Sequence, residues 1–319
     1  MKSGLAVLLA GVLLAAPLVG FGGEEPSPQL DEVTVTGERA GPGLWHVYQG
    51  PGPGQLWILG SVSPLPKDMT WRSKQLESIL ESTDQVLVVK PVEIGIARAL
   101  WLLVTQRALL SAGKDKKLED DLPPELYARF ARQRARFGGD ANKWENYRPI
   151  IAATFLEEQA FHKVGLSTRL DLGEEVRTLA KRHHVRIEEF KIAGVRDLLE
   201  ALKTLPPATE NKCVAASLAT LETGLPRLMD RAKAWATGDV ERIQGLPEAA
   251  EVAACRTAVT MESTSGNLYE TLRRTWVNNM KQHLQQGGVT LAVVSMDMLL
   301  ESGGFLDALR TAGYRIDPP

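Results

Sequence analysis

The stretch with the clearest chemical interest is WILGSVSPLP, residues 57–66, where an apolar strand runs into a turn of small residues. Turns of this kind often carry catalytic side chains. The turn offers Gly60, Ser61 and Ser63, but no histidine, cysteine or acid. Ser63 would need a base beside it to act as a nucleophile, and GSVSP is not the G-x-S-x-G turn that exposes a hydrolase serine. We therefore interpret Ser63 as a hydroxyl that caps the turn.

Two carboxylates near the C-terminus form a second candidate site. Asp297 and Glu301 follow the apolar run VTLAVVS, residues 289–295. Carboxylate oxygens could bind a hard cation, but acids at a strand end more often cap the helix that follows. The five histidines show no zinc-ligand spacing.

An α/β fold must position these residues. Short β-rich runs alternate with amphipathic helices, which predicts a mixed β-sheet flanked by helices. The predicted strands are LWHVYQ, QLWILGS, QVLVVK, HVRIEEF, VTLAVVS and YRID, with GPGPG as a hairpin turn between the first two. The predicted helices cover 71–80, 126–137, 149–162 and 173–183, and a large helical insertion at about 193–285 includes a pair of helices within 211–258.

The composition limits the classes of partner. The chain has 319 residues, of which 44% are hydrophobic, and a formal net charge of −2. This is enough apolar material for a substantial core. Because positive and negative charges are mixed along the chain, no field would attract nucleic acid. We expect no nucleic-acid role.

The order of the segments from about Leu44 onward resembles the TraB/PrgY/GumN family, also called TraB/GumN, which includes the TIKI-type proteases that cleave Wnt. The likeness rests on six segments: LWILGSVSPLPKDMTW, TDQVLVV, LEDDLPPELYARF, YRPIIAATFL, GLSTRLDLGEEVRTLAKRHHVRI and VTLAVVSMDMLLESGGFLDALRTAGYRI. The resemblance implies one domain over residues 44–319. It also implies a metal-dependent hydrolytic site at three strand ends, built from two histidines in Gly-x-x-His or similar turns and one glutamate. Such ligands hold a metal that turns a bound water into a nucleophile.

Carried onto this sequence, the implied site is degenerate. Gly60 keeps the glycine of the first turn, but Ser63 stands at its histidine position. Val89 and Lys90 end the second strand, so neither supplies the carboxylate. Asp297 stands where the last histidine is expected. Lys90 would bind an anion in the former pocket or neutralise a nearby acid. We expect no metal or other cofactor.

The N-terminus predicts a signal peptide over residues 1–22. Lys2 supplies a positive start, residues 5–16 are an apolar run, and Pro17 breaks it. The run is shorter than the roughly 20 residues that span a membrane. We expect cleavage near Gly23, no transmembrane helix in the mature chain, and a periplasmic or secreted bacterial protein.

Residues 23–43 predict a disordered linker, because they are rich in proline, glycine and glutamate without a helical period. Within the linker, DEVTVTGE (Asp31 to Glu38) resembles the TonB box, an extended strand that a partner captures by β-augmentation. The segment is either a docking strand for an envelope protein or a plain linker.

Cys213 and Cys255 lie in the helical insertion of a chain that we expect to be exported. An oxidising compartment favours a disulfide between them. The alternative is two buried free thiols.

Two functions remain open from the sequence. The first is an exported, non-catalytic scaffold or binding module that keeps the TraB/GumN-like fold. The second is a metal-dependent hydrolase or peptidase whose site has moved to Asp297, Glu301 and other partners. Loss of the expected ligand at all three positions favours the first.

Overall fold

The structure is a computed structural model that describes residues 41–50, 52–71, 74–89, 105, 107–168, 172–190, 195–246, 249–262, 266–301 and 303–319. The predicted signal peptide, the segment Asp31 to Glu38 and Lys90 lie outside these residues. Among the described residues, no helix combines the length and apolar character needed to cross a membrane.

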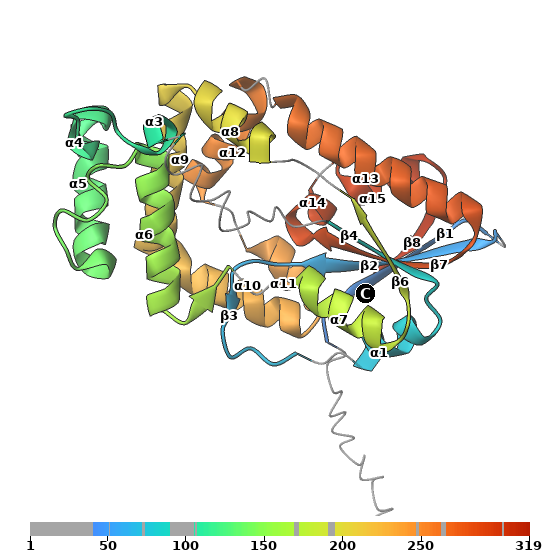
Figure 1. Ribbon diagram of the computed structural model, residues 1–319. Coiled ribbons are helices and arrows are strands. Elements are labelled where there is room, and N and C mark those ends of the chain that lie inside the picture. Colours follow the sequence, from blue (N-terminus) through green and yellow to red (C-terminus); the bar gives the residue numbers. More distant parts are fainter. Residues whose placement is uncertain are drawn as a thin grey trace, which may run out of the picture. The chain divides into compact units, whose positions relative to one another are not determined.

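A six-stranded mixed sheet carries one of two hydrophobic cores (Figure 1). In spatial order its strands are Arg186–Phe190 (β6), Gln85–Val89 (β4), Gly288–Ser295 (β7), Gly54–Ser61 (β2), Leu44–Tyr48 (β1) and Arg315–Asp317 (β8). The four strands from β6 to β2 run parallel, whereas β1 is antiparallel to both of its neighbours. The predicted mixed α/β fold is confirmed, and each predicted β-rich run is one of these strands.

A second sheet has only two short strands, Leu65–Pro66 (β3) and Leu166–Ser167 (β5). The α-helices up to β6 are Lys74–Glu81 (α1), Arg107–Leu110 (α3), Leu118–Asp121 (α4), Pro124–Gln133 (α5), Pro149–Lys163 (α6) and Leu172–Arg182 (α7). A π-helical turn, Arg134–Gly138 (η1), extends α5. These elements agree with the four helices predicted before residue 184.

The remaining helices are Val195–Thr204 (α8), Pro207–Ala219 (α9), Leu225–Ala236 (α10), Val240–Gly245 (α11), Ala250–Glu262 (α12), Gly266–Gln286 (α13), Met296–Leu300 (α14) and Phe305–Thr311 (α15), with a π-helical turn at Thr220–Gly224 (η2). The predicted pair within 211–258 is therefore wrong, because α9 to α12 occupy that region. Gly238, with φ of 69°, follows α10 in the left-handed conformation that commonly ends a helix.

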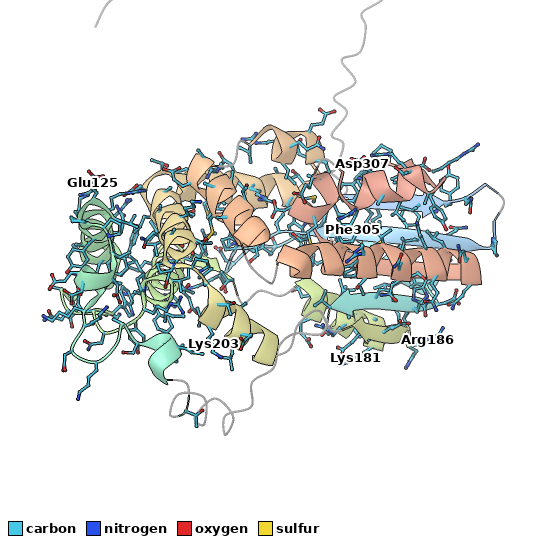
Figure 2. All side chains as sticks on the ribbon, turned by 90° about the horizontal axis from the view of Figure 1, so that it is seen from above. Glu125, Lys181, Arg186, Lys203, Phe305 and Asp307 are labelled. Carbon is cyan, nitrogen blue, oxygen red and sulfur yellow. A yellow bond between two sulfur atoms is a disulfide. The ribbon has the colours of Figure 1, made fainter. Side chains whose placement is uncertain are left out.

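Helices cover both faces of the large sheet, with α13 and α15 on one face and α1 and α7 on the other (Figure 1). The backbone of Leu284 in α13 lies so close to Gly54 of β2 that a Cβ atom would collide with it. Phe305 of α15 lies against α13, with its ring centroid 6.2 Å from that of Trp276 (Figure 2). These contacts bury one face of the sheet.

The second hydrophobic core lies among the helices and includes Phe130 of α5, Leu156 of α6 and Val214 of α9. The helix α10 joins this core to the core of the sheet. Leu225 at its start belongs to the helical core, and Trp235 near its end is fully buried in the sheet core. In this way α10 brings side chains from the helical region to the ends of the parallel strands.

Candidate functional site at the carboxyl edge of the sheet

The three strand ends at which the resemblance implies metal ligands meet at one edge of the sheet. β7 lies between β2 and β4, and all three strands run parallel. Ser61 at the end of β2 pairs with Ser295 at the end of β7, and β4 ends at Val89. Ligands in parallel α/β sheets commonly bind at this carboxyl edge. The fold therefore places the expected positions together, whichever residues occupy them.

Gly60 has a packing role at this edge. A Cβ atom at Gly60 would lie 2.6 Å from Cε of Met296 and 3.1 Å from Cζ3 of Trp45. Its carbonyl oxygen accepts a hydrogen bond of 2.7 Å from Nε1 of Trp235. A larger residue at this position would therefore have to displace the end of the Met296 side chain and press on the Trp45 ring.

Ser63 does not behave as predicted. It is exposed beyond the end of β2, and its side chain makes no hydrogen bond with the residues that the structure describes. The hydroxyl that bonds here belongs to Ser61, whose Oγ donates to the carbonyl oxygen of Val294 at 3.3 Å. The predicted capping role of Ser63 is therefore not seen in this part of the chain.

Asp297, the residue at the position of the last expected histidine ligand, forms an ion pair. It lies in the first turn of α14, directly after β7. Nη2 of Arg231 on α10 donates to Oδ1 of Asp297. The Arg231 side chain is 23% exposed and that of Asp297 is 59% exposed. The carboxylate that replaces the expected histidine is neutralised by a guanidinium.

Arg231 carries an unsatisfied group. Its Nε is buried and has no hydrogen-bond partner within the described ranges. A guanidinium stays charged at any ordinary pH. Arg231 thus fixes a positive charge beside the end of β7.

A second arginine lies at the end of β4. Arg177 of α7 donates from Nη2 to the carbonyl oxygen of Val89. Its other nitrogens bond Glu189 and Glu174, each at 3.0 Å, and its side chain is only 5% exposed. Arg177 therefore ties β4, β6 and α7 together where the family resemblance implies a glutamate ligand. Lys90, the next residue, lies outside the described residues.

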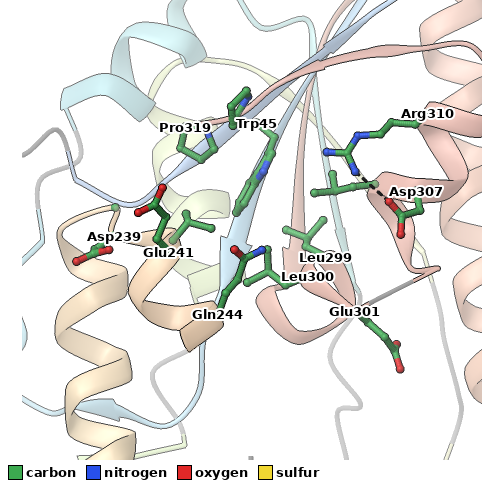
Figure 3. Close-up of a pocket in the computed structure, with 14 residues that line it drawn as sticks. Trp45, Asp239, Glu241, Gln244, Leu299, Leu300, Glu301, Asp307, Arg310 and Pro319 are labelled. Carbon is green, nitrogen blue, oxygen red and sulfur yellow. Dashed lines mark hydrogen bonds and ion pairs between the residues drawn. The ribbon is translucent and has the colours of Figure 1, made fainter. Parts of the chain in front are cut away.

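A pocket of about 660 Å³ lies beside this edge, between α11, α14 and α15 (Figure 3). Its wall includes Leu299 and Leu300, and Glu301 stands at its rim. The Glu301 carboxylate points away from both leucines in Figure 3. Asp297 does not line this pocket. The two carboxylates predicted as a weak metal pair thus have different surroundings.

Neither carboxylates nor histidines gather into a metal site in the described chain, where no group of three or more His, Cys, Asp or Glu side chains could hold an ion. His46 of β1 stacks on Trp57, with 4.3 Å between the ring centroids. His283 is buried and contacts Gln85, the first residue of β4, at the opposite end of that strand. The donors that the described residues present at the carboxyl edge therefore do not fit a transition metal.

The two cysteines pair as expected. Cys213 of α9 and Cys255 of α12 are joined by a disulfide, with their Cα atoms 4.7 Å apart. The bond links two helices that pack along each other in the helical region. It lies apart from the carboxyl edge of the sheet.

Three side chains that cover the strand ends could not be identified from the sequence, namely Arg177, Arg231 and Trp235. Arg231 and Trp235 belong to the helical region, 66 and 175 positions from their partners Asp297 and Gly60. The only local signal was the helix LPRLMDRAKAWA, whose tryptophan and arginines stand one helical turn apart. This pattern alone does not say which surface it covers.

One of the comparisons with known proteins identifies a family for this chain. The model of the TraB/PrgY/gumN family matches residues 43–318. Searches of curated proteins and of solved structures found no match. Since the family model spans nearly the whole described chain, the chain belongs to the TraB/PrgY/gumN family.

Proposed function

We propose that this chain is an exported member of the TraB/PrgY/gumN family that acts as a non-catalytic scaffold or binding module. The observation that carries the proposal is the ion pair between Arg231 and Asp297. It occupies one of the three strand ends at which the resemblance implies a metal ligand.

The electrostatics support this proposal. A divalent cation at the carboxyl edge would face the fixed charge of Arg231, and it would have to compete with that guanidinium for Asp297. At the end of β4, Arg177 engages both Glu189 and Glu174, so a cation would have to compete with this guanidinium for either carboxylate. Ser63 offers only a neutral hydroxyl, which is a poor ligand for the transition metals that prefer imidazole.

An activity assay tests the proposal. The purified protein is incubated with zinc, manganese or cobalt and with general peptidase and esterase substrates. We expect turnover at background for the wild type and for Asp297→Ala and Glu301→Ala alike. Turnover that is lost in either variant would favour the alternative function, a hydrolase with a relocated site.

Export is part of the proposal and rests on the N-terminal apolar run and on the disulfide, since such bonds persist in oxidising compartments. Intact mass of the protein from an envelope fraction should show a chain that starts near Gly23. Ellman titration of the denatured, unreduced protein should find no free thiol. Retention of Met1 to Gly20, or two free thiols, would count against export.

The segment Asp31 to Glu38 is proposed as a docking strand for an envelope partner. Its pattern of β-branched residues suits capture by β-augmentation. Deletion of these residues should abolish capture of a TonB-like partner without changing the melting temperature. Equal capture by both forms would reduce the segment to a linker.

A further inference from the structure

The helical region carries an aromatic groove that the proposed function does not use. It has a volume of about 560 Å³ and lies between α6 and the loop that precedes it. Its aromatic residues are Trp144, Tyr147 and Phe155. Tyr147 and Phe155 meet edge to face, with 5.1 Å between their ring centroids.

Exposure sets this groove apart from the rest of the surface. Three large hydrophobic side chains in the described chain are markedly exposed, each to 38%, namely Tyr147, Phe155 and Val164. Two of the three line the groove. Aromatic residues gathered in an open groove are typical of protein-binding surfaces rather than of a surface that faces only water.

The groove is held in shape by the structure beneath it. Trp144 has φ of 69°, a left-handed conformation that bulky residues rarely adopt. The next residue, Glu145, is buried, pairs with Arg134 and accepts a hydrogen bond of 2.9 Å from the Tyr127 hydroxyl. The Trp144 ring lies on Gly138, where a Cβ atom would stand 3.1 Å from it. The buried pair thus anchors a strained backbone that presents the tryptophan.

The charges around the groove are mainly positive. Lys143 lies over the Trp144 ring, with Nζ 4.7 Å from its centroid, and also bonds Oε1 of Gln159. Gln159 in turn donates to the carbonyl oxygen of Phe137 at 2.6 Å, so the ammonium of Lys143 is held in place. Lys163 adds a second ammonium to this rim, against one acid, Glu158.

We propose that the aromatic groove is a docking site for an acidic peptide segment of another protein that carries an aromatic or large aliphatic side chain. The side chain would pack between Phe155 and Trp144, and carboxylates beside it would meet Lys143 and Lys163. Exposed apolar rings supply the affinity, and the cationic rim selects the sign of charge of the partner. The groove is separate from the carboxyl edge of the sheet, so its test does not depend on whether that edge is catalytic.

The test uses the full chain and three labelled synthetic peptides, measured by fluorescence anisotropy. One has a phenylalanine flanked by aspartates, one has alanine in its place, and one has lysines in place of the aspartates. We expect the first peptide to bind at least about tenfold more tightly than the other two, because both parts of the site are needed. Binding should weaken as salt is raised.

Variants locate the binding. Phe155→Ala should lower the affinity for the acidic aromatic peptide about tenfold. Lys163→Glu should also lower this affinity and make it depend less on salt concentration. Val164→Ala is the matched control, because Val164 is equally exposed but does not line the groove. Melting temperatures of all three variants show that they remain folded.

Three results would overturn the proposal. The first is equal affinity for the acidic and basic peptides, or a dissociation constant above about 1 mM for the acidic aromatic peptide. The second is an affinity unchanged by Phe155→Ala. The third is self-association of the chain that Phe155→Ala abolishes, which would assign the groove to a second copy.

Discussion

Two arginines bind groups at the carboxyl ends of the parallel strands. Arg231 engages the carboxylate of Asp297, and Arg177 binds the last carbonyl group of β4. Arg177 is fully bonded through its three nitrogens, which is typical of a structural residue. Arg231 differs because its Nε is buried without a hydrogen bond to the described residues. We interpret Arg231 as a residue retained for its charge rather than for stability.

This interpretation makes a prediction for stability. Asp297→Asn should lower the free energy of unfolding by about 1 kcal/mol, the scale of a partly exposed ion pair. Arg231→Met should change it little, because burying an unbonded Nε already costs about 1 to 3 kcal/mol that the variant recovers. Urea unfolding measures both. A larger loss for Arg231→Met than for Asp297→Asn would show that the arginine is held mainly for stability.

Glu157 is a second residue with an unusual environment. It lies on α6 against α9, where the Ser217 hydroxyl donates to Oε2 at 3.2 Å. Burial raises the pKa of the Glu157 carboxyl above its ordinary value of 4.5, and the hydrogen bond from Ser217 opposes this effect. Folding therefore disfavours the charged form of Glu157.

The expected consequence is a pH-dependent stability. Below pH 4.5 the Glu157 carboxyl is protonated in both the folded and the unfolded protein. Its contribution to the free energy of unfolding is then fully present. As the pH rises through the raised folded pKa, that contribution is lost. Glu157→Gln should therefore match the wild type near pH 4 and be more stable than it at pH 7. Glu158→Gln is the control, because it changes an exposed neighbour, and its stability should not differ from that of the wild type in this pH-dependent way. The same dependence of unfolding free energy on pH in the wild type and both variants would contradict the prediction.

At the scale of elements, Arg148 joins three helices of the helical region. It precedes α6, pairs with Glu210 of α9 at 2.9 Å and donates to the carbonyl oxygens of Leu202 and Leu205, around the end of α8. Glu210 also accepts from the backbone nitrogen of Ile150 at 3.0 Å. Three backbone groups, namely two carbonyl oxygens and one amide nitrogen, are thus bonded by one ion pair.

Loss of this arginine should be costly. Arg148→Met leaves the Glu210 carboxylate, which is only 6% exposed, without its counter-charge. We expect a loss of about 3 kcal/mol in the free energy of unfolding, as for other broken buried pairs. Arg310→Met is the control, since Arg310 pairs with Asp307 at the surface, and it should cost less than about 1 kcal/mol. Similar losses in both variants would contradict the role given to Arg148.

At the scale of the whole molecule, the sequence predicted the elements better than the contacts between them. β2 and β7 were readable because their central residues are mostly apolar and buried, although Trp57 is half-buried. The start of α6 was readable because Pro149 suits the first turn of a helix. The two-residue strands β3 and β5 are too short to give any periodic pattern.

The candidate site was predictable only in part, for a similar reason. The strand order brings Ser63, Val89 and Asp297 to one edge, as the family resemblance implies. The side chains that cover this edge come from α7 and α10, and their partners are set by packing over long sequence separations. No spacing within the sequence could identify Arg231 as the partner of Asp297.

We propose that an arginine occupies the place of a metal at the carboxyl edge, and the metal content of the purified protein measures this. The purified mature protein is dialysed against zinc, manganese or cobalt, and bound metal is measured by elemental analysis beside an Asp297→Ala variant. We predict far less than one equivalent of metal in both proteins. One equivalent in the wild type that disappears in Asp297→Ala would show that Asp297 holds a metal in spite of Arg231, and would rule out the replacement of metal by arginine.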